Sequence, residues 1–504
     1  MSKYNQANLL IPTIIVLGNN NRSLPTEQII KELELMIQPD GDDLVSYSGR
    51  NDSRFSQTVR NLIAPERNVL PKDLLYYNTD TKCTILTDKG YELYKRLSNN
   101  KQHQQSLPYM QEKGGVKTFL AALRTKPFLL LAGISGTGKS QIVKEMAFVT
   151  CPDLDDLRKS DVSPGNYCLV EVKPNWHDST ELLGYDSAIK KHYVVTPFVK
   201  FVVKAMRYPE VPFFVCLDEM NLAPVEQYFA EFLSVLESRK LVDGKIVSEP
   251  LIKAEYFKNN FVALDLFDLP TSQYKGIPNV KSVDLPDESL GDKADIWHTL
   301  QKDGLCIPQN LIVIGTVNMD ETTHQFSRKV IDRAMTFEMN EANFESYFEG
   351  KVTLDYVDEP LSADLFLSRN VNGNKAISEL GNVYEGFKSE VVNTLNELNN
   401  ALQDTPFKIA YRVQNEMVLY FAELLRENTE ADQQKTLATA LDDIMMMKVL
   451  PRIEGDDELL GNESGGALHN LMEFANSHNL TKSKDKIKEM QNRLNRSHFT
   501  SFWP

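Results

Sequence analysis

FLLLAGISGTGKSQIVKEMA, residues 128–147, combines three patterns that together point to one kind of fold. An apolar run, Phe128 to Leu131, leads into the glycine-rich segment Gly133–Ser140, and residues with helical spacing follow. This order of strand, loop and helix is that of a P-loop, in which backbone N–H groups and a helix N-terminus surround phosphate oxygens. The pattern therefore predicts a nucleoside triphosphate site, rather than a plain strand-to-helix turn.

The residue types within this loop have separate tasks. Lys139 can reach the β- and γ-phosphates, and the Ser140 hydroxyl can bind Mg²⁺. The glycines allow successive N–H groups to turn inward around phosphate oxygens. We predict that the nucleotide is bound by Gly133, Ser135, Gly136, Thr137, Gly138, Lys139 and Ser140.

Length and composition restrict the class of protein. The chain has 504 residues, enough for about three domains. It has no apolar run near the roughly 20 residues of a membrane span, and its first residues lack the pattern of a secretory signal. Its five cysteines are widely spaced and form no CxxC pair, which favours a reduced, cytoplasmic protein without a structural zinc site. The net charge of −15 means that any contact with DNA must come from a local patch.

Residues 10–100 read as a small α+β module. We expect helices over 26–36 and 52–63, then a β-hairpin made by 74–77 and 83–86, and a closing helix from Thr87. Helices followed by a two-stranded wing suggest a winged helix, and the order resembles the N-terminal winged-helix domain of Mrr-type restriction proteins.

The basic residues of this module give it a candidate DNA-binding surface. The arginines in or beside its second helix are Arg50, Arg54, Arg60 and Arg67. The first hundred residues hold twelve basic and twelve acidic side chains, so the module as a whole is neutral. Packing on a protein partner, with the arginines on a solvated face, therefore stays open as an alternative.

A second strand, Val211 to Glu219, ends in two acids. A buried parallel strand of this kind brings its carboxyl end to the nucleotide. We predict that Asp218 binds Mg²⁺ and that Glu219 orients and polarises the attacking water. The competing reading is a pair of surface acids that cap the next helix. That helix is expected to be long and amphipathic, from Met220 to Glu237.

A third strand, from Leu311 to Val317, ends at Asn318. An amide at this strand tip can hydrogen-bond the lytic water and the γ-phosphate. Further along, Arg328 and Arg333 are candidate arginine fingers that reach the nucleotide of a neighbouring subunit. Either arginine could instead pair with Asp332.

About 70 residues, Lys240 to Pro308, separate the second and third strands. A connection of this length is typical of a functional elaboration, for the pore side of a ring or for a partner. Elsewhere, Asp161, Glu171 and Lys173 imitate a PD-(D/E)xK nuclease. The strand that carries Glu171 should lie inside the NTPase sheet, so we expect no nuclease site here. Trp176 lies nearby in the sequence, and a lone tryptophan of this kind is expected to be a core residue.

The C-terminal part is expected to be helical, over 380–402, 410–425, 431–447, 467–474 and 483–496. Arg412 stands at the start of a helix, from which a helical lid could fold it over the nucleotide. We therefore divide the chain into a recognition domain (1–100), a polar linker (101–115), an α/β core (116–345, with the insertion at 240–308) and a helical lid with further helices (346–504).

Several segments together resemble the AAA+ ATPase class, and more narrowly the McrB motor subunits of McrBC modification-dependent restriction systems. The segments are GISGTGKS (133–140), PNWHDSTELLGY (174–185), LDEMNLAPVEQYFAEFLSVLE (217–237), GTVNMDE (315–321), AYRVQNEM (410–417), VLPRIEG (449–455) and SHFTSFW (497–503). The resemblance covers about 115–500. The family's usual M-N-x-x-D is V-N-M-D-E here, so Asn318 is kept and Glu321 takes the acidic place.

The resemblance implies an α/β AAA+ P-loop core, with a parallel sheet between helices, a C-terminal helical lid and an N-terminal winged-helix domain. It also implies hydrolysis of GTP, or of ATP, with Mg²⁺. The expected partners are further copies in a ring, most simply a hexamer, double-stranded DNA, modified DNA included, and a separate McrC-like PD-(D/E)xK nuclease subunit; no membrane is expected. Two alternatives remain: a MoxR-like ATPase that remodels a protein partner, and an NTP-switched DNA-binding regulator.

Overall fold

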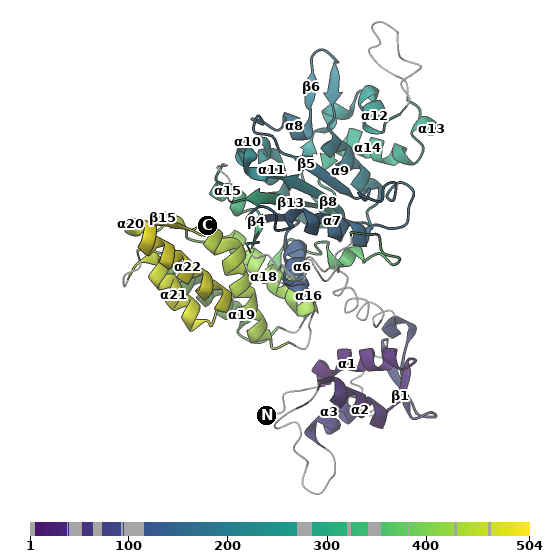
Figure 1. The fold of residues 1–504 in the computed structure, drawn as a ribbon. Coiled ribbons are helices and arrows are strands. Elements are labelled where there is room, and N and C mark those ends of the chain that lie inside the picture. The colour runs from purple at the N-terminus through teal and green to yellow at the C-terminus, as the bar shows by residue number, and fades with distance from the viewer. Residues whose placement is uncertain are drawn as a thin grey trace. The chain divides into compact units, whose positions relative to one another are not determined.

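The computed structural model describes most of the chain. The described residues are 6–37, 39, 53–63, 73–91, 94, 115–269, 285–319, 324–340, 354–381, 383–427, 431–461 and 465–503. The chain divides into two compact units, 1–106 with 425–432 and 107–424 with 433–504 (Figure 1). Each unit is described by itself below.

Over its described residues, the first unit combines helices with a small sheet. Its elements are α1 Gln6–Asn19, β1 Ser23–Pro25, α2 Thr26–Ile37, α3 Arg54–Ile63, β2 Leu75–Asn78 and β3 Cys83–Leu86. Residues 88–91 are helical, in agreement with the closing helix expected from Thr87. The strands pair antiparallel in the order β1-β3-β2, which confirms the expected hairpin of β2 and β3. The apolar faces of α1, α2 and α3 pack together around Leu17, Leu33 and Phe55. Sequence patterns do not lead us to expect α1, because Pro12 lies inside it and proline usually ends helices.

A five-stranded parallel sheet forms the centre of the second unit. Its strands are β4 Phe128–Gly133, β5 Tyr167–Glu171, β8 Phe213–Asp218, β13 Leu311–Asn318 and β14 Met335–Glu338. They lie in the order β14-β4-β13-β8-β5. The strand that ends at Asn318 therefore lies between the strand of the glycine-rich loop and the strand of the two acids. All three strands reach the same edge of the sheet.

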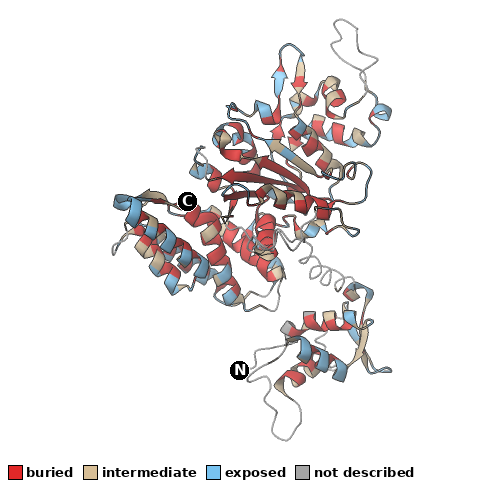
Figure 2. Ribbon diagram, in the orientation of Figure 1, coloured by how far each residue is buried: buried red, intermediate tan, exposed pale blue. Residues whose placement is uncertain are grey.

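Helices cover both faces of this sheet, which explains why its central strands are almost continuously apolar. α7 Lys139–Thr150 lies on one face, and α9 Pro197–Arg207 and α11 Ala230–Glu237 lie on the other (Figure 1). In β4, Phe128 and Leu130 belong to the core shared with α9 and α11, whereas the intervening residues point to the opposite face. Figure 2 shows the central strands as buried along their length. The predicted α/β core is thus present as a parallel sheet between helices.

The helix expected from Met220 to Glu237 is broken, so this prediction is wrong in detail. The structure has a short 3₁₀ turn, Met220–Leu222, then α10 Val225–Tyr228 and α11. Pro224 lacks the N–H that a continuous helix would need at this point. The carbonyl of Met220 instead accepts a hydrogen bond from the Tyr228 hydroxyl, over 2.9 Å.

The region between β8 and β13 carries its own small elements. They are β9 Lys240–Val242, β10 Lys245–Val247, β11 Pro250–Ile252, η5 Ala254–Phe257, α12 Asn260–Leu266, α13 Asp287–Leu290, η7 Gly291–Lys293, α14 Ala294–Asp303 and β12 Leu305–Cys306. Phe257 and Trp297 are buried in the main core with the sheet. The insertion is therefore a packed part of the second unit over its described residues.

The C-terminal part is helical as expected, although the bounds of its helices differ from the prediction. They are α16 Gly373–Leu380, α17 Phe387–Ala401, α18 Tyr411–Glu427, α19 Gln433–Ile444, α20 Asp457–Leu460, α21 Ala467–Ser477 and α22 Thr481–Ser497. The expected helix over 380–402 is interrupted, because Gly381 and Gly386 have positive φ angles of 74° and 94°. α19 continues into a π-helical turn, Met445–Val449, whose Met445 and Met447 are buried. No described helix is both long enough and apolar enough to cross a membrane.

Candidate nucleotide site

The glycine-rich loop connects β4 to α7 in the way that the sequence pattern predicts. Gly136 and Gly138 both have φ near 81°, a conformation that other residues rarely adopt. Gly133 needs to be glycine for a different reason: a Cβ atom there would lie 2.2 Å from the carbonyl oxygen of Met339. Ser135 and Gly136 are exposed at the tip. The loop is therefore a shaped backbone turn with its tip open to solvent.

Lys139, the first residue of α7, folds its side chain back into this loop. Its Nζ donates to the carbonyl oxygens of Gly133, over 3.1 Å, and of Ile134, over 2.7 Å. The Lys139 side chain is buried, and the Thr137 hydroxyl donates to the same Ile134 carbonyl. A phosphate at the loop would offer this buried cation a charged partner in place of neutral carbonyls. The loop thus fits the triphosphate of a nucleotide.

The two acids of β8 are held by β13, the neighbouring strand. The Thr316 hydroxyl donates to Oδ1 of Asp218 over 2.7 Å and accepts from the backbone N–H of Glu219 over 3.0 Å. Asn318 donates from Nδ2 to Oε1 of Glu219 over 3.0 Å. Residues two apart on a strand share one face, which is why Thr316 and Asn318 act together. Sequence reasoning missed Thr316, although its place two residues before Asn318 was a usable signal.

Glu219 has a strained backbone, with φ 50° and ψ 50°. A left-handed conformation of this kind costs a non-glycine residue about 1 kcal/mol or more. The strain turns the chain sharply after β8, so that the Glu219 carboxylate faces Asn318. Asp218, Glu219 and Asn318 therefore meet at the carboxyl edge of the sheet.

The same edge brings Asn318 next to the glycine-rich loop. In the sheet register Asn318 is the partner of Gly133, and the N–H of Met319 donates to the Gly133 carbonyl over 3.2 Å. Ser140 lies in the first turn of α7, close in sequence to the loop. Magnesium is commonly held by one or two carboxylates together with substrate phosphates. Ser140 and Asp218 are the residues that would hold Mg²⁺ here. Glu321, the departure from the family motif, lies outside the described residues.

Arg328 is the first residue of the short helix α15 Arg328–Ile331, and Arg333 lies two residues beyond its end. Arg328 donates to the Pro406 carbonyl over 3.3 Å, and its guanidinium lies 4.7 Å from the ring centre of Phe407. Arg333 donates to the Lys329 carbonyl over 3.1 Å. Asp332, which was considered as a partner for both arginines, instead forms an ion pair with Arg452, over 3.0 Å. The role of either arginine toward a neighbouring subunit stays a prediction.

Arg412 contacts acids rather than the glycine-rich loop. Its Nε donates to Oε2 of Glu237 over 2.9 Å, and Asp332 lies 4.0 Å from its Nη1. Glu237 is the last residue of α11 and Arg412 lies in α18, so this contact joins the C-terminal helices to the α/β core. The predicted contact of Arg412 with nucleotide stays a prediction.

Glu237 belongs to a larger ionic cluster between the core and the C-terminal helices. Lys126 forms ion pairs with Glu237, over 2.8 Å, and with Glu416, over 2.7 Å, and Lys448 also pairs with Glu416, over 2.7 Å. Burial lowers the pKa of Lys448 to about 8. Burial alone would raise the pKa of Glu416, but the charges of Lys126 and Lys448 outweigh it and hold that pKa below its usual value.

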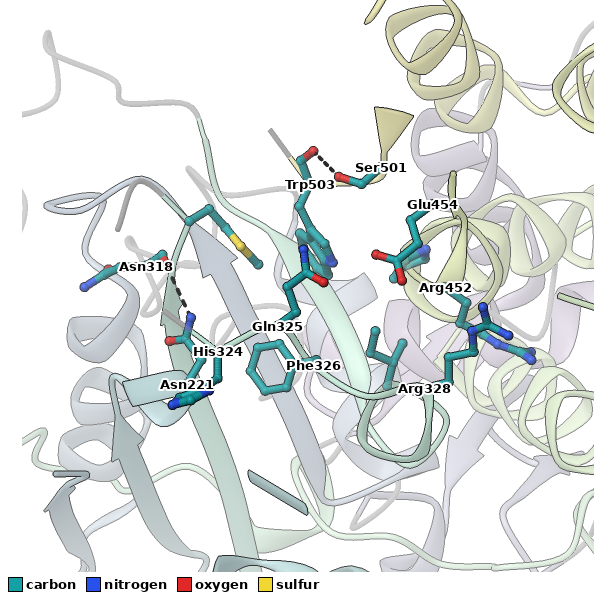
Figure 3. A pocket seen from close by; sticks show the side chains of 13 residues that line it. Asn221, Asn318, His324, Gln325, Phe326, Arg328, Arg452, Glu454, Ser501 and Trp503 are labelled. Carbon is teal, nitrogen blue, oxygen red and sulfur yellow. Dashed lines mark hydrogen bonds between the residues drawn. The ribbon is translucent and has the colours of Figure 1, made fainter. Parts of the chain in front are cut away.

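A cavity of about 210 Å³ lies beside Asn318, between the sheet edge and the C-terminal strands (Figure 3). These strands are β15 Glu454–Asp456 and β16 Phe499–Ser501, which pair antiparallel. The residues that line the cavity are Asn221, Asn318, Met319, His324, Gln325, Phe326, Arg328, Ile331, Pro451, Arg452, Glu454, Ser501 and Trp503. The cavity thus connects Asn318 with two arginines and with the C-terminal segment.

The predicted DNA-binding arginines lie in the first unit, where the structure describes two of them. Arg60 forms an ion pair with Glu27 over 2.7 Å, and Arg54 begins α3. Arg50 and Arg67 lie outside the described residues. The structure therefore describes two of the four arginines, and the role of all four in DNA binding stays a prediction.

Comparisons with known proteins add little to the geometry. A family model described as a domain of unknown function, DUF8727, matches residues 366–499, about a quarter of the chain. No curated protein matches. Among solved structures, a chain from Cytophaga hutchinsonii described as a "putative ATPase" is similar at 12% identity, covering 69% of this chain and 86% of that chain, with a TM-score of 0.39. That likeness is too weak for any inference.

Proposed function

We propose that this chain is a Mg²⁺-dependent nucleoside triphosphatase of the AAA+ class that works as a DNA motor. The observation that carries the proposal is the meeting of four features at one sheet edge: the glycine-rich loop, Lys139, the acid pair and the Asn318 amide that holds Glu219. Each feature has a separate task in phosphoryl transfer, and no simpler binding role needs all of them.

The chemistry assigned to these residues is as follows. Loop N–H groups and Lys139 bind the phosphates, and Ser140 and Asp218 hold the metal ion. The ion neutralises charge on the phosphates when it is bound. Glu219 orients a water molecule for attack, and the Asn318 amide keeps the Glu219 carboxylate in position.

The biological setting is proposed from the family resemblance. The chain would assemble as a ring, most simply a hexamer, in which Arg333 or Arg328 completes the neighbouring site. Residues 1–100 would bind DNA through Arg50, Arg54, Arg60 and Arg67, and a separate McrC-like nuclease would cut that DNA. GTP is the expected nucleotide, with ATP as the alternative. A MoxR-like ATPase that remodels a protein fits the same nucleotide site.

Turnover measurements test the proposal. The purified full chain is assayed with GTP and with ATP, with Mg²⁺, and with or without unmodified and methylated duplex DNA. We expect Mg²⁺-dependent hydrolysis that DNA stimulates. Glu219→Gln should reduce turnover by about 10²–10⁴-fold and leave nucleotide binding intact. Glu226→Gln, an exposed acid on α10, is the matched control and should keep wild-type turnover.

The possible outcomes separate the hypotheses. Hydrolysis of ATP alone, with no response to DNA, would favour protein remodelling over a DNA motor. Absence of hydrolysis of either nucleotide, or full activity of Glu219→Gln, would refute the assignment of the site.

A further inference from the structure

A short β-hairpin follows α8 Thr180–Leu183 and projects away from the central sheet (Figure 1). Its strands, β6 Tyr185–Ser187 and β7 His192–Val194, pair antiparallel. The connecting tip holds Ile189, which is 94% exposed, followed by two exposed lysines, Lys190 and Lys191. Among the described residues, neither lysine has an acidic partner within ion-pair distance. The tip therefore presents one apolar side chain and two positive charges to solvent.

The insertion between β8 and β13 supports this hairpin. His192 stacks on Phe261 of α12 at 5.6 Å between ring centres, and the Asn259 side chain donates to the Lys191 carbonyl over 3.3 Å. Tyr193 packs on Tyr256 at 4.9 Å. The long insertion thus has a structural task, because it braces β7 from the side. A hairpin held by these contacts can move as a rigid element, whereas an unsupported loop would deform.

The base of the hairpin is linked to the acid pair by buried contacts. Trp176 packs edge-on against Tyr228 at 5.2 Å, and Tyr228 donates to the carbonyl of Met220, the residue after Glu219. At the hairpin itself, the Tyr193 hydroxyl donates to the Leu183 carbonyl over 2.9 Å. These two sets of residues belong to one buried core, so we expect a shift of the backbone at Glu219 to be felt at the base of the hairpin. Trp176 is a core residue, as expected, and it lies in this connection.

The tip is too small for an ordinary protein interface. Stable protein interfaces bury about 800 Å² per partner, and four tip residues cannot supply that area. A linear polyanion is different, because its phosphates repeat along the strand and a lysine gains from each phosphate that it meets. The apolar Ile189 can contact sugars or bases. The chain as a whole has a net charge of −15, so the two adjacent lysines make the tip unusually basic for this protein.

We propose that the β6–β7 hairpin is the element through which the second unit contacts the phosphate backbone of DNA, and that its movement is tied to the state of the acid pair. This inference rests on the proposed function, because it requires a nucleotide-driven DNA motor. It adds a second DNA contact, separate from the arginines of residues 1–100, and it gives the insertion a purpose.

Paired substitutions in the full chain test the proposal. Lys190→Ala/Lys191→Ala removes the two tip charges. Lys240→Ala/Lys245→Ala removes two exposed lysines from the β9–β10 hairpin of the insertion, which makes it a matched control. DNA affinity is measured by fluorescence anisotropy with a non-hydrolysable nucleotide over a range of salt concentrations. Hydrolysis is measured with and without DNA, and thermal unfolding verifies that each variant is folded.

We expect the tip variant to bind DNA more weakly, with the slope of log affinity against log salt reduced by about one for each lost phosphate contact. The ratio of hydrolysis with DNA to hydrolysis without DNA should fall toward one. The control pair should match the wild type in both measurements. A photoreactive benzoylphenylalanine in place of Ile189 should cross-link to DNA, whereas the same group in place of Val242, at the control hairpin, should not.

Each contrary result has a defined meaning. If the wild type binds DNA and responds to it while the tip variant does so equally well, the hairpin inference is wrong and the proposed function stands. If the wild type hydrolyses nucleotide without any response to DNA, both are wrong. Cross-linking from position 189 to a protein rather than to DNA would also overturn the inference.

Discussion

Asn318 donates a hydrogen bond to Glu219 over 3.0 Å and thereby joins the ends of β13 and β8. The donor stands at the end of a buried strand, and the acceptor stands in a strained, left-handed turn. The left-handed turn directs the Glu219 carboxylate toward Asn318, and the hydrogen bond from the Asn318 amide then holds the carboxylate in that position. An amide suits this task, since it binds a carboxylate without neutralising it.

Substitution of Asn318 should therefore affect turnover more than binding. We expect Asn318→Ala to lower kcat by about 10–100-fold, with a smaller change in KM, because Glu219 is no longer held. Asn318→Asp keeps the size but places a second carboxylate against Glu219, and it should be at least as impaired. Steady-state kinetics and nucleotide binding by anisotropy measure the two effects. An Asp variant as active as the wild type would contradict the role given to this hydrogen bond.

Arginine fingers that act between subunits can be detected by mixing variants. Arg333→Ala should lower turnover by about 10³-fold or more, and Glu219→Gln should be nearly inactive for a different reason. If Arg333 serves a neighbour, a mixture of the two variants contains sites with an intact Glu219 from one subunit and an intact Arg333 from the next. Turnover of the mixture should then exceed that of either variant alone.

The same experiment with Arg328→Ala shows which arginine has this role. Recovery with only one of the two arginine variants identifies the finger. A mixture that shows just the average of its components would argue that neither arginine acts across subunits.

Tyr228 links the acid pair to the core, so its hydroxyl should matter for stability and for turnover. Tyr228→Phe leaves the Met220 carbonyl without this donor, at a cost of about 1–3 kcal/mol in the free energy of unfolding. Because Met220 follows Glu219 directly, we also expect lower turnover in the absence of DNA. Tyr193→Phe removes a similar buried hydroxyl-to-carbonyl bond far from Glu219 in sequence.

The Tyr193 variant thus serves as the comparison. A similar loss of stability in both variants, with turnover in the absence of DNA reduced only for Tyr228→Phe, is the expected pattern. Urea unfolding and DNA-free hydrolysis give the two readouts. Equal turnover in the two variants would mean that Tyr228 only stabilises the fold.

Glu416 should make the stability of the second unit sensitive to acid. Its two lysine partners lower its pKa in the folded chain, so the ionised carboxylate stabilises the fold above the usual value of 4.5. This contribution is lost as the pH falls below 4.5 and through the folded pKa. Glu416→Gln leaves Lys126 and Lys448 without their shared acid and should cost about 3–5 kcal/mol at neutral pH.

The acid dependence itself provides the more specific measurement. As the pH falls below 4.5, the unfolding midpoint of Glu416→Gln should fall less steeply than that of the wild type. Asp268→Asn removes an exposed ion pair with Lys200 and should change the unfolding free energy by less than about 1 kcal/mol. Parallel acid profiles for the wild type and Glu416→Gln would show that this carboxylate does not titrate as inferred.

Local pattern was sufficient to predict the loop, the acid strand and the strand tip, because each depends on neighbouring residues in the sequence. Apolar runs predicted β4, β8 and β13, and their shared edge followed from parallel pairing. The spacing of Thr316 and Asn318 places both side chains on one face of the strand, but the partners of Thr316 depend on cross-strand register, which one strand alone does not reveal. The amphipathic spacing continues across Pro224 and therefore predicts one long helix, although proline interrupts the helical hydrogen bonds at this point.

Long-range ion pairs were also beyond local pattern. Arg412 begins a helix, and its partner Glu237 is far away in sequence, so no spacing rule could connect them. Asp332 was an alternative partner for Arg328 or Arg333, yet it pairs with Arg452. The hairpin tip was visible in the sequence as Ile189-Lys190-Lys191, but its exposure and its bracing by the insertion required the tertiary structure.

The Gly133 carbonyl accepts hydrogen bonds from both Lys139 and Met319. If a bound nucleotide draws Lys139 away, the Gly133 carbonyl keeps its hydrogen bond from the Met319 N–H. Met319 also lines the cavity, together with Trp503. Any compound that occupies this cavity and favours one position of Met319 should therefore change nucleotide affinity. By thermodynamic reciprocity, nucleotide must change the affinity of that compound by the same factor. A small molecule in this cavity would thus change nucleotide binding without competing for the glycine-rich loop.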